Sequence, residues 1–250
     1  MILAIANQKG GVGKTTTAIN LGAGLGALER RVLLVDCDPQ GNATRGLGAR
    51  AEPPHLYHAL VGEVPISATI RPSGFPNLDL APSQRDLVGI EVELVGETGW
   101  EQRLKKVLAE VAGQYDTVLL DCPPSLGHLT VNALVAADGV LVPLQCEYFA
   151  LEGISELLAT IQRVQGSLNR HLQIAGILLT MYDDRTNLSK DVAQEIRSHF
   201  AGKVYETVVP RNIRLAEAPS HGLPIFQYDI KSRGAEAYLA VAREILRRAA

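Results

Sequence analysis

Five short apolar segments recur along the chain, and each is followed by a turn and then by a stretch with helical spacing of apolar residues. The segments are ILAIAN (2–7), RVLLVD (31–36), DTVLLD (116–121), GVLVPL (139–144) and LQIAGILLT (172–180). Because nearly every position in them is apolar, they suit strands that are covered on both faces. The pattern predicts an α/β fold with a mostly parallel, twisted sheet and helices on both faces.

The intervening segments predict helices at about 15–28, 101–112, 128–137, 151–168, 189–200 and 234–248. The last of these carries an apolar stripe at helical spacing, flanked by arginines. A helix lying on a membrane surface has this pattern, and so does a helix packed against the core of a domain. We favour packing against the core. The stripe consists of Tyr238, Val241, Ala242, Ile245 and Leu246.

A chain of 250 residues with 46% hydrophobic residues is long enough to bury a sizeable core, and we expect one domain over 1–250. The segment 52–99 is rich in Pro and Gly, apart from a short predicted strand at NLDLAP (77–82). We therefore expect 52–99 to be an irregular, mobile insertion.

Charge, cysteines and hydropathy narrow the class of protein. The formal net charge is −3, but from Arg185 onward the chain has eleven Lys and Arg against seven Asp and Glu. This excess is compatible with a basic face near the C-terminus, although charge alone favours an ordinary solvated surface. Three scattered cysteines cannot form a closed disulfide set, and the six histidines lack metal-ligand spacing. The apolar start of the chain is too short for a signal peptide, and no run of about 18 apolar residues follows. We expect a reduced, cytoplasmic protein without structural zinc.

The stretch NQKGGVGKTTT (7–17) lies between the first strand and the first helix, where backbone N–H groups can surround phosphates. It departs from the usual G-x-x-x-x-G-K-[ST] loop because Gln8 replaces the first glycine. Lys14 would neutralise the terminal phosphates, and the Thr15 hydroxyl would bind Mg²⁺. We expect a nucleoside triphosphate to be held by the loop residues Gly10, Gly11, Val12, Gly13, Lys14, Thr15 and Thr16.

Acidic residues end two of the predicted strands. Asp36 and Asp121 close the segments at 31–36 and 116–121, and Asp38 follows in the next loop. Ligands of open α/β sheets bind at the carboxyl ends of strands, so these acids should face the phosphates. We expect Asp36 and Asp121, with Thr15, to form the Mg²⁺ site, and Asp38 to orient an attacking water, because an ordinary aspartate is a weak base at neutral pH.

Four motifs in order resemble one family. KGGVGKTT (9–16), DCDPQGN (36–42), LLDCPPS (119–125) and PRNIRLAEAPSHGLPI (210–225) together resemble the ParA/MinD class of deviant Walker A ATPases, and most closely its chromosomal ParA (Soj-type) branch. The resemblance covers nearly the whole chain. Since the chain begins at the first strand, we expect no N-terminal DNA-binding extension of the kind that longer members carry.

The resemblance implies specific roles. ATP and Mg²⁺ would be the ligands, and Lys9 would cross to the nucleotide of a second subunit in an ATP-dependent homodimer, joining Lys14 and Asp38 as a catalytic residue. A lysine is a point charge without arginine's planar fork, so we expect Lys9 to contribute more to dimer formation than to catalysis. Pro210 and Asn212 would contact the adenine.

The resemblance also gives the basic C-terminal part a purpose. ParA dimers bind duplex DNA without sequence preference, and we expect the chain to be a slow, nucleoid-associated ATPase of chromosome or plasmid partition. Its partner would be a ParB-type centromere-binding protein. The candidate DNA contacts are Arg185, Arg211, Arg214, Lys231, Arg233 and Arg247.

Three other functions share parts of this pattern. A MinD-like membrane-surface ATPase of cell-division positioning is the main alternative, but its last helix would be amphipathic and free of the core. An iron–sulfur electron carrier would need a cysteine placed between two subunits, and Cys122 lies too close to Asp121 for that. A ligase or kinase of the same fold would need a second-substrate pocket, for which 52–99 offers no convergent polar set.

Overall fold

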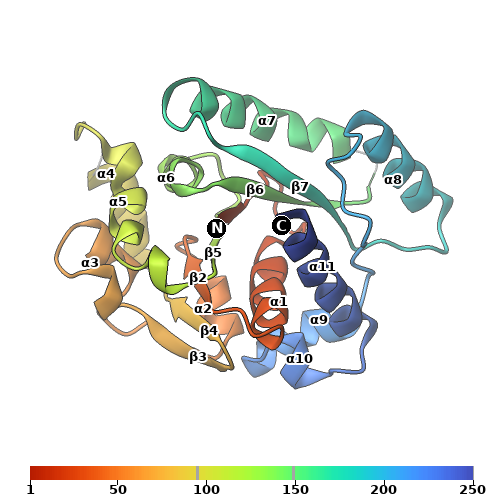
Figure 1. Ribbon diagram of the computed structural model, residues 1–250, viewed down its shortest axis with the longest axis horizontal. Helices are drawn as coiled ribbons and strands as arrows, with labels where there is room; N and C mark the ends of the chain where they lie inside the picture. The colour runs from red at the N-terminus through yellow and green to blue at the C-terminus, as the bar shows by residue number, and fades with distance from the viewer. Residues whose placement is uncertain (94–95, 148–149, 250) are drawn as a thin grey trace.

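The computed structural model describes residues 1–93, 96–147 and 150–249, and these include one seven-stranded sheet in the order β3-β4-β2-β5-β1-β6-β7 (Figure 1). All neighbouring strands are parallel except β3 and β4. The mostly parallel sheet predicted from the apolar segments is confirmed. The strands are β1 (Ile2–Ile5), β2 (Val32–Asp36), β3 (Arg71–Phe75), β4 (Leu78–Ala81), β5 (Thr117–Asp121), β6 (Gly139–Gln145) and β7 (Gln173–Thr180).

Helices cover both faces of the sheet (Figure 1). One layer contains α1 (Lys14–Ala27), α2 (Asn42–Gly46), α9 (Ile213–Glu217), α10 (Ile225–Tyr228) and α11 (Arg233–Ala249). The other contains α3 (Leu56–Leu60), α4 (Ile90–Glu93), α5 (Arg103–Ala109), α6 (His128–Ala136), α7 (Ala150–Ser167) and α8 (Asn187–His199). Short 3₁₀ turns lie at Ile66–Ala68, Arg85–Gly89, Trp100–Gln102, Ala112–Gln114 and Ala218–His221.

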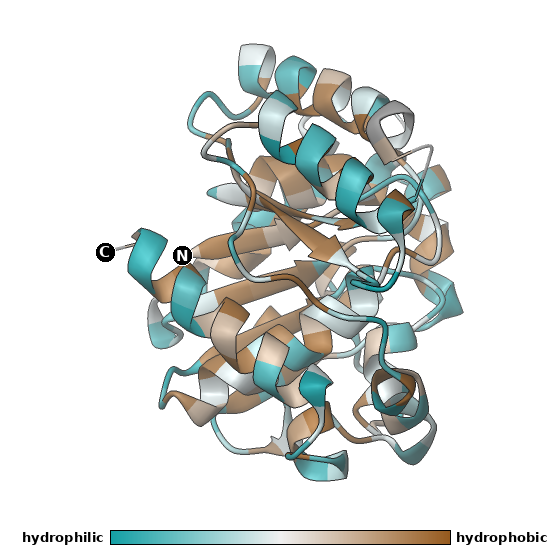
Figure 2. Cartoon of the chain, turned by 90° about the vertical axis from the view of Figure 1, so that its right-hand side faces the viewer, coloured by the Kyte–Doolittle hydropathy of each residue, from teal (hydrophilic) through white to brown (hydrophobic). Residues whose placement is uncertain are grey.

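Each central strand contributes side chains to two separate apolar cores. In β2, Leu34 packs against the α1 layer, whereas Leu33 and Val35 pack against the α6 layer. Successive side chains of a strand point to opposite faces, so a strand covered on both sides must be apolar at every position. Figure 2 shows this arrangement as brown strands between helices whose outward faces are teal.

The segment 52–99 is only partly irregular, which corrects our expectation. The predicted strand at 77–82 is confirmed as β4, but β4 also pairs with the antiparallel edge strand β3, which we did not predict. β3 contains Pro72 and Gly74, residues that are usually depleted in strands and are tolerated at a sheet edge. The edge position therefore explains why composition hid this strand.

The C-terminal helix α11 packs against α1. Tyr238, Val241, Ala242 and Ile245 are buried, and the Tyr238 hydroxyl lies 3.1 Å from the Thr17 hydroxyl of α1. This confirms core packing and contradicts the membrane-surface interpretation of the apolar stripe. In the part of the chain that the structure describes, no helix has both the length and the apolar character needed to cross a bilayer.

Candidate nucleotide site

The loop between β1 and α1 forms an open cradle. Gly11 and Gly13 have left-handed φ angles of 76° and 90°, which L side chains rarely adopt, and a Cβ on Gly11 would meet no atom within 4 Å. α1 then begins at Lys14, with no side chain capping its first turn. Its first N–H groups therefore remain available to an anion, as at other phosphate-binding helix termini.

Two connected hollows extend from this cradle. The first has a volume of about 510 Å³ and is lined by the glycine loop, Lys14, Thr15 and Asp38. The second, of about 360 Å³, is mainly apolar and includes Pro210 and Asn212. Because both hollows share Gly13, Thr16 and Met181, they suit a ligand with a charged end and a flat apolar end.

Lys14 is 7% exposed and curls back over its own loop. Its Nζ donates a hydrogen bond to the Lys9 carbonyl oxygen over 3.0 Å. Burial lowers the pKa of Lys14, and the nearby Asp121, Cys122 and Asp38 oppose that shift. A buried ammonium with one carbonyl partner has donors left for phosphate oxygens, as expected for the loop lysine.

Asp36 and Asp121 lie side by side at the carboxyl ends of β2 and β5, in the same register, and both are completely buried. Burial raises the pKa of Asp36 to about 6, against the lowering effect of its hydrogen bonds. Burial also raises the pKa of Asp121, and the neighbouring Asp36 raises it further. Two adjacent buried carboxylates favour the approach of a cation.

The two acids differ in their hydrogen bonds. Among the described residues, no hydrogen bond of normal length reaches either Asp121 oxygen, and the nearby Thr15 hydroxyl only partly opposes the rise of the Asp121 pKa. Asp36 accepts hydrogen bonds from the Thr44 N–H and hydroxyl at 2.8 and 2.7 Å, and from the Asp38 N–H at 3.2 Å. Asp121 therefore has its acceptor capacity available for a ligand, whereas Asp36 is largely engaged in holding α2 and the Asp38 loop.

This donor set fits Mg²⁺, which binds through one or two protein oxygens together with water and phosphate oxygens. The described residues include no group of three or more His, Cys, Asp or Glu that could hold a metal alone. Thr15 and Asp121 would thus hold the ion jointly with the nucleotide. A direct bond from Asp36 stays an untested prediction.

Asp38 lines the phosphate hollow and is 5% exposed. Its Oδ1 accepts a hydrogen bond from the Gln40 N–H at 2.9 Å, and its carbonyl oxygen accepts one from the Ser83 hydroxyl. These contacts fix the loop that carries the carboxylate. Its predicted role in orienting water is compatible with this position.

Lys9 does not enter the phosphate hollow of its own chain. Its Nζ forms an ion pair with Glu147 Oε2 at 2.9 Å, and both side chains are about half exposed. The described geometry thus holds the lysine at the surface, beside the mouth of the site. Whether it reaches a second subunit stays a prediction.

The predicted adenine contacts lie in the apolar hollow. Asn212 caps α9, and its Oδ1 accepts a hydrogen bond from the Leu215 N–H at 3.3 Å. The amide Nδ2 is therefore the group that remains for a base. Pro210 lies two residues earlier in the same wall.

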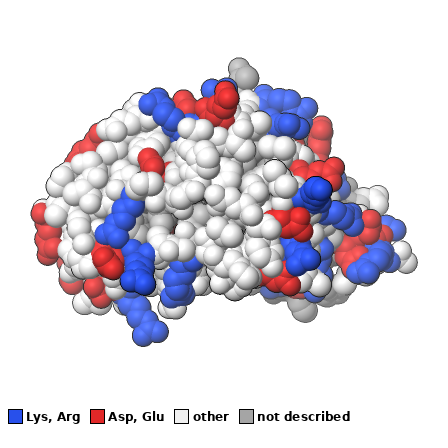
Figure 3. Space-filling view, turned by 90° about the horizontal axis from the view of Figure 1, so that it is seen from below, with Lys and Arg blue, Asp and Glu red and all other residues white. Residues whose placement is uncertain are grey.

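Three of the six candidate DNA contacts are paired with acids. Arg185 holds Asp183 through two hydrogen bonds of 2.9 and 2.7 Å, and Arg233 lies 4.0 Å from Asp184. On the face seen in Figure 3, Lys and Arg likewise occur in small groups among acidic residues, without one continuous basic stripe. Among the described residues, Arg211, Lys231 and Arg247 have no acidic partner.

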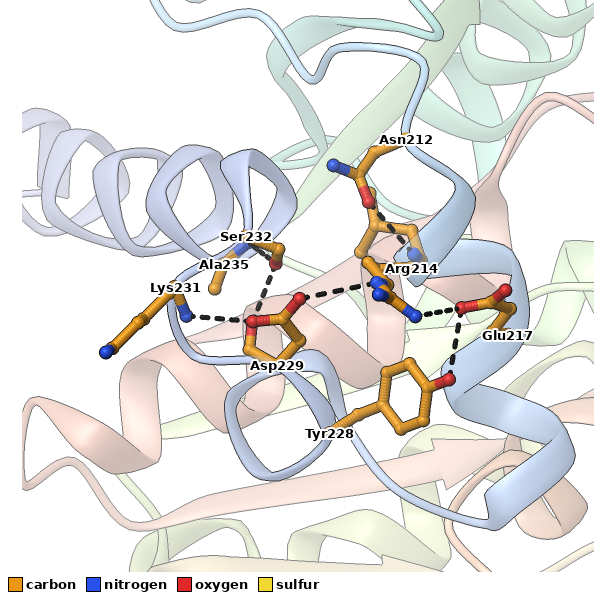
Figure 4. A network of polar contacts seen from close by, with 9 residues as sticks. Asn212, Arg214, Glu217, Tyr228, Asp229, Lys231, Ser232 and Ala235 are labelled. Atoms are coloured by element: carbon orange, nitrogen blue, oxygen red, sulfur yellow. Dashed lines mark hydrogen bonds and ion pairs between the residues drawn. The ribbon is translucent and has the colours of Figure 1, made fainter.

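Arg214 is the third paired cation, and it joins two segments (Figure 4). Its guanidinium contacts Glu217 at 3.0 Å and Asp229 at 3.5 Å, and the Tyr228 hydroxyl also donates to Glu217. This network ties α9 to the turn before α11. Arg214 thus has a structural role that its sequence context did not reveal.

Several residues at the site were missed by sequence reasoning. Thr180 donates from its hydroxyl to the Val12 carbonyl at 2.8 Å and so ties the end of β7 to the glycine loop. Met181 follows with a left-handed φ of 50° and lines both hollows. Their position at the end of a predicted strand was the only signal available.

Comparisons with known proteins agree with this geometry. Residues 1–174 match a family model described as an AAA domain. The chain is 53% identical over 249 residues to the chromosome partitioning protein ParA of Myxococcus xanthus, covering 99% of this chain and 88% of that protein. It is 54% identical over 246 residues to the sporulation initiation inhibitor protein Soj of Bacillus subtilis, covering 98% and 97%.

Solved structures extend the comparison. A Mycobacterium smegmatis protein named cobyrinic acid a,c-diamide synthase, solved with bound ADP and magnesium, has a TM-score of 0.87 and 42% identity, covering 98% of this chain and 94% of that one. The cell division ATPase MinD of Pyrococcus furiosus has a TM-score of 0.81 and 26% identity, covering 98% of both chains. A nucleotide-binding fold thus extends over nearly the whole molecule.

Proposed function

The chain belongs to the ParA/Soj family of chromosome-partitioning ATPases, and from this premise we propose that it is a slow ATPase whose ATP-bound dimer binds duplex DNA without sequence preference. The observation that carries the ATP-binding part of the proposal is the buried carboxylate of Asp121, which lacks a hydrogen bond of normal length, beside the uncapped start of α1 and the buried Lys14. Dimer formation and DNA binding follow from family membership. A site with these three groups favours Mg²⁺ together with a nucleoside triphosphate.

The residues of the loop divide the work of binding. The glycines let the backbone approach the phosphates, the first N–H groups of α1 donate to them, and Lys14 neutralises their charge. Bound Mg²⁺ would supply further charge neutralisation during phosphoryl transfer. Asn212 donates to the base from Nδ2, and Pro210 packs against its face.

Hydrolysis depends on how water is held. Asp38 lies on the wall of the phosphate hollow and orients the attacking water, while Lys9 of the partner subunit adds positive charge to the transferred group. A cationic group supplied by a partner is worth about 10³–10⁵ in rate in GTPase systems. We expect a smaller share for a lysine, and therefore slow turnover.

Dimer formation would switch DNA binding on. If each subunit contributes three or four phosphate contacts, the dimer makes about seven, and the salt slope on a log–log plot is about −6. A monomer would have half that slope. The described structure favours Arg211, Lys231 and Arg247 as contacts, because Arg185, Arg214 and Arg233 are already paired with acids.

We further propose a ParB-type protein as the partner that stimulates hydrolysis, and the cytoplasm and nucleoid as the place of action. Both proposals follow from family membership. The membrane-surface alternative receives no support from α11, whose apolar face is buried on α1.

Sedimentation of Asp38→Ala tests the proposal. Without hydrolysis, ATP should convert the protein to a dimer, and duplex DNA should co-sediment only when ATP is present. Glu195→Gln in the same background is the control, because it removes one exposed negative charge on α8, outside the proposed site, and should leave the dimer and DNA binding unchanged. A protein that stays monomeric with saturating ATP, or that binds liposomes and not DNA, would contradict the proposed function.

A further inference from the structure

Lys9 and Lys14 both have internal partners in this structure. Lys14 donates to the backbone of Lys9, and Lys9 pairs with Glu147 at 2.9 Å. The Lys9 N–H also donates to the Asn7 side chain, which fixes the backbone from which the lysine extends. The Lys9 amine is thus directed toward the end of β6, away from the phosphate hollow.

Glu147 is held in place for this contact. The amide of Gln145, at the end of β6, donates to Glu147 Oε1, while Oε2 receives the Lys9 amine. The two oxygens of one carboxylate therefore have separate partners on β6 and on the glycine loop. Asn7 donates to the Pro143 carbonyl at 2.8 Å, which ties the same two segments together one step deeper in the fold.

We propose that Glu147 is a positioning residue that retains the Lys9 amine within its own subunit, so that an ATP-bound dimer forms only by breaking this ion pair in both copies. The inference rests on the proposed function, because it needs Lys9 to act on a second subunit. Glu147 belongs to the same subunit as Lys9 and holds the amine at 2.9 Å, directed away from the phosphate hollow. To reach a phosphate bound in another molecule, the Lys9 side chain has to swing away from Glu147, and this movement breaks the ion pair.

The exposure of the two side chains sets the expected effect of this ion pair on dimer affinity. Lys9 and Glu147 have side-chain exposures of 41% and 45%, and an ion pair in that setting shifts an equilibrium by about twofold. A dimer breaks two such pairs, so their combined effect on dimer affinity is about fourfold. This is a modest barrier, suited to a protein whose dimer must also come apart.

The first test needs no nucleotide. In the nucleotide-free protein, acetylation of Lys9 by a small amine-reactive ester is measured by mass spectrometry, with the exposed Lys105 as internal reference. Glu147→Gln should raise the Lys9 rate about two- to fivefold relative to Lys105. Glu195→Gln, which removes one exposed charge elsewhere, should leave the ratio unchanged. Equal ratios in Glu147→Gln and the parent protein would overturn the proposal.

The second test measures the dimer. In the Asp38→Ala background with ATP, adding Glu147→Gln should tighten the dimer about fourfold by sedimentation, with the monomer's ATP affinity unchanged. A dimer affinity equal to that of Asp38→Ala alone would overturn the proposal and leave the proposed function intact. If Asp38→Ala itself forms no dimer, the proposed function fails, and the role of Glu147 in restraining dimer formation fails with it.

Discussion

Asp121 lies opposite Asp36 in the β2–β5 register, and the two carboxylates are completely buried, yet only Asp36 accepts hydrogen bonds of normal length. An ionised carboxylate in the position of Asp121 destabilises the ligand-free fold. The carboxylate of Asp121 thus lowers the stability of the ligand-free fold, and its oxygens are available to the proposed cation.

Asp121→Asn should stabilise the ligand-free protein at high pH. The pKa of Asp121 is raised on folding, so the folded state binds a proton that the unfolded state has lost, and stability falls as pH rises above the unfolded value near 4. The introduced asparagine carries no charge at any of these pH values, so the variant should not lose stability in this way. At pH 8 it should be more stable than the parent protein by about 1–3 kcal/mol. Urea unfolding in EDTA at pH 5 and pH 8 measures the free energy of unfolding of both proteins. The prediction is contradicted if the advantage of Asp121→Asn over the parent protein becomes smaller as pH rises.

The same variant should lose the magnesium dependence of nucleotide binding. Asp121 is the buried acid without a hydrogen bond of normal length, so its carboxylate is the group that Mg²⁺ would recruit. Calorimetric titration with ATP, in Mg²⁺ and in EDTA, should give different affinities for the parent protein and similar ones for Asp121→Asn. Persistent Mg²⁺ dependence would move the metal site elsewhere.

Lys14→Ala should abolish useful nucleotide binding. The ammonium is buried at the cradle, and loss of its charge-assisted hydrogen bonds to phosphates should weaken ATP about 100-fold or more. Titration with a fluorescent ATP analogue measures this, with Lys105→Ala as the exposed control. Normal affinity in Lys14→Ala would remove the phosphate-loop assignment.

Lys9→Ala should separate binding from assembly. Because the Lys9 amine points away from the hollow of its own chain, the monomer should keep its ATP affinity within about twofold. The ATP-dependent dimer should be lost, since the partner's phosphates lose their cation. Sedimentation with ATP checks the second result, and an intact dimer would show that Lys9 does not cross the interface.

Two substitutions at Asn212 should separate helix capping from base recognition. Asn212→Asp keeps the oxygen that accepts from the Leu215 N–H but removes the Nδ2 donor, so ATP affinity should fall about tenfold while thermal stability changes little. Asn212→Ala should in addition lose about 1 kcal/mol of stability with the cap. Thermal melting and ATP titration of both variants measure the two effects, and equal ATP affinity in Asn212→Asp and the parent would refute base contact.

Lys231 and Arg214 should differ in how they affect DNA binding. Lys231→Ala removes a cation without an acidic partner among the described residues. Since the dimer carries two copies, the magnitude of its salt slope should fall by about 2. Arg214→Ala breaks the contacts to Glu217 and Asp229 and should mainly lower the melting temperature. Salt titrations of DNA binding with both variants decide this, and a larger slope change in Arg214→Ala would reverse the assignment.

The strands and the phosphate loop were predictable because each follows from local pattern. The strands are apolar at every position, and Gly11, Gly13 and Lys14 form a compact motif at a strand-to-helix junction. The pairing partners were not predictable. Glu147 is 138 residues from Lys9, and Asp229 is 15 residues from Arg214, so only the folded chain brings these charges together.

Two short helices were not predicted from the sequence, for a related reason. α2 and α9 each contain five residues, too few for one helical period to repeat, and both are held by contacts that start or end far away in the sequence. Thr44 of α2, for example, accepts a hydrogen bond from the Ser83 N–H, 39 residues away. The local spacing of apolar residues does not predict such contacts.

The hydrogen bond between Tyr238 and Thr17 connects the C-terminal helix to the proposed phosphate site. Thr17 stands one turn into the helix that opens the phosphate cradle, and Tyr238 belongs to the C-terminal helix and lines the apolar hollow. A change in the position of α11 would therefore act, through this contact, on the helix that opens the proposed phosphate site. A fusion partner joined at the C-terminus is therefore expected to disturb the phosphate cradle through this contact.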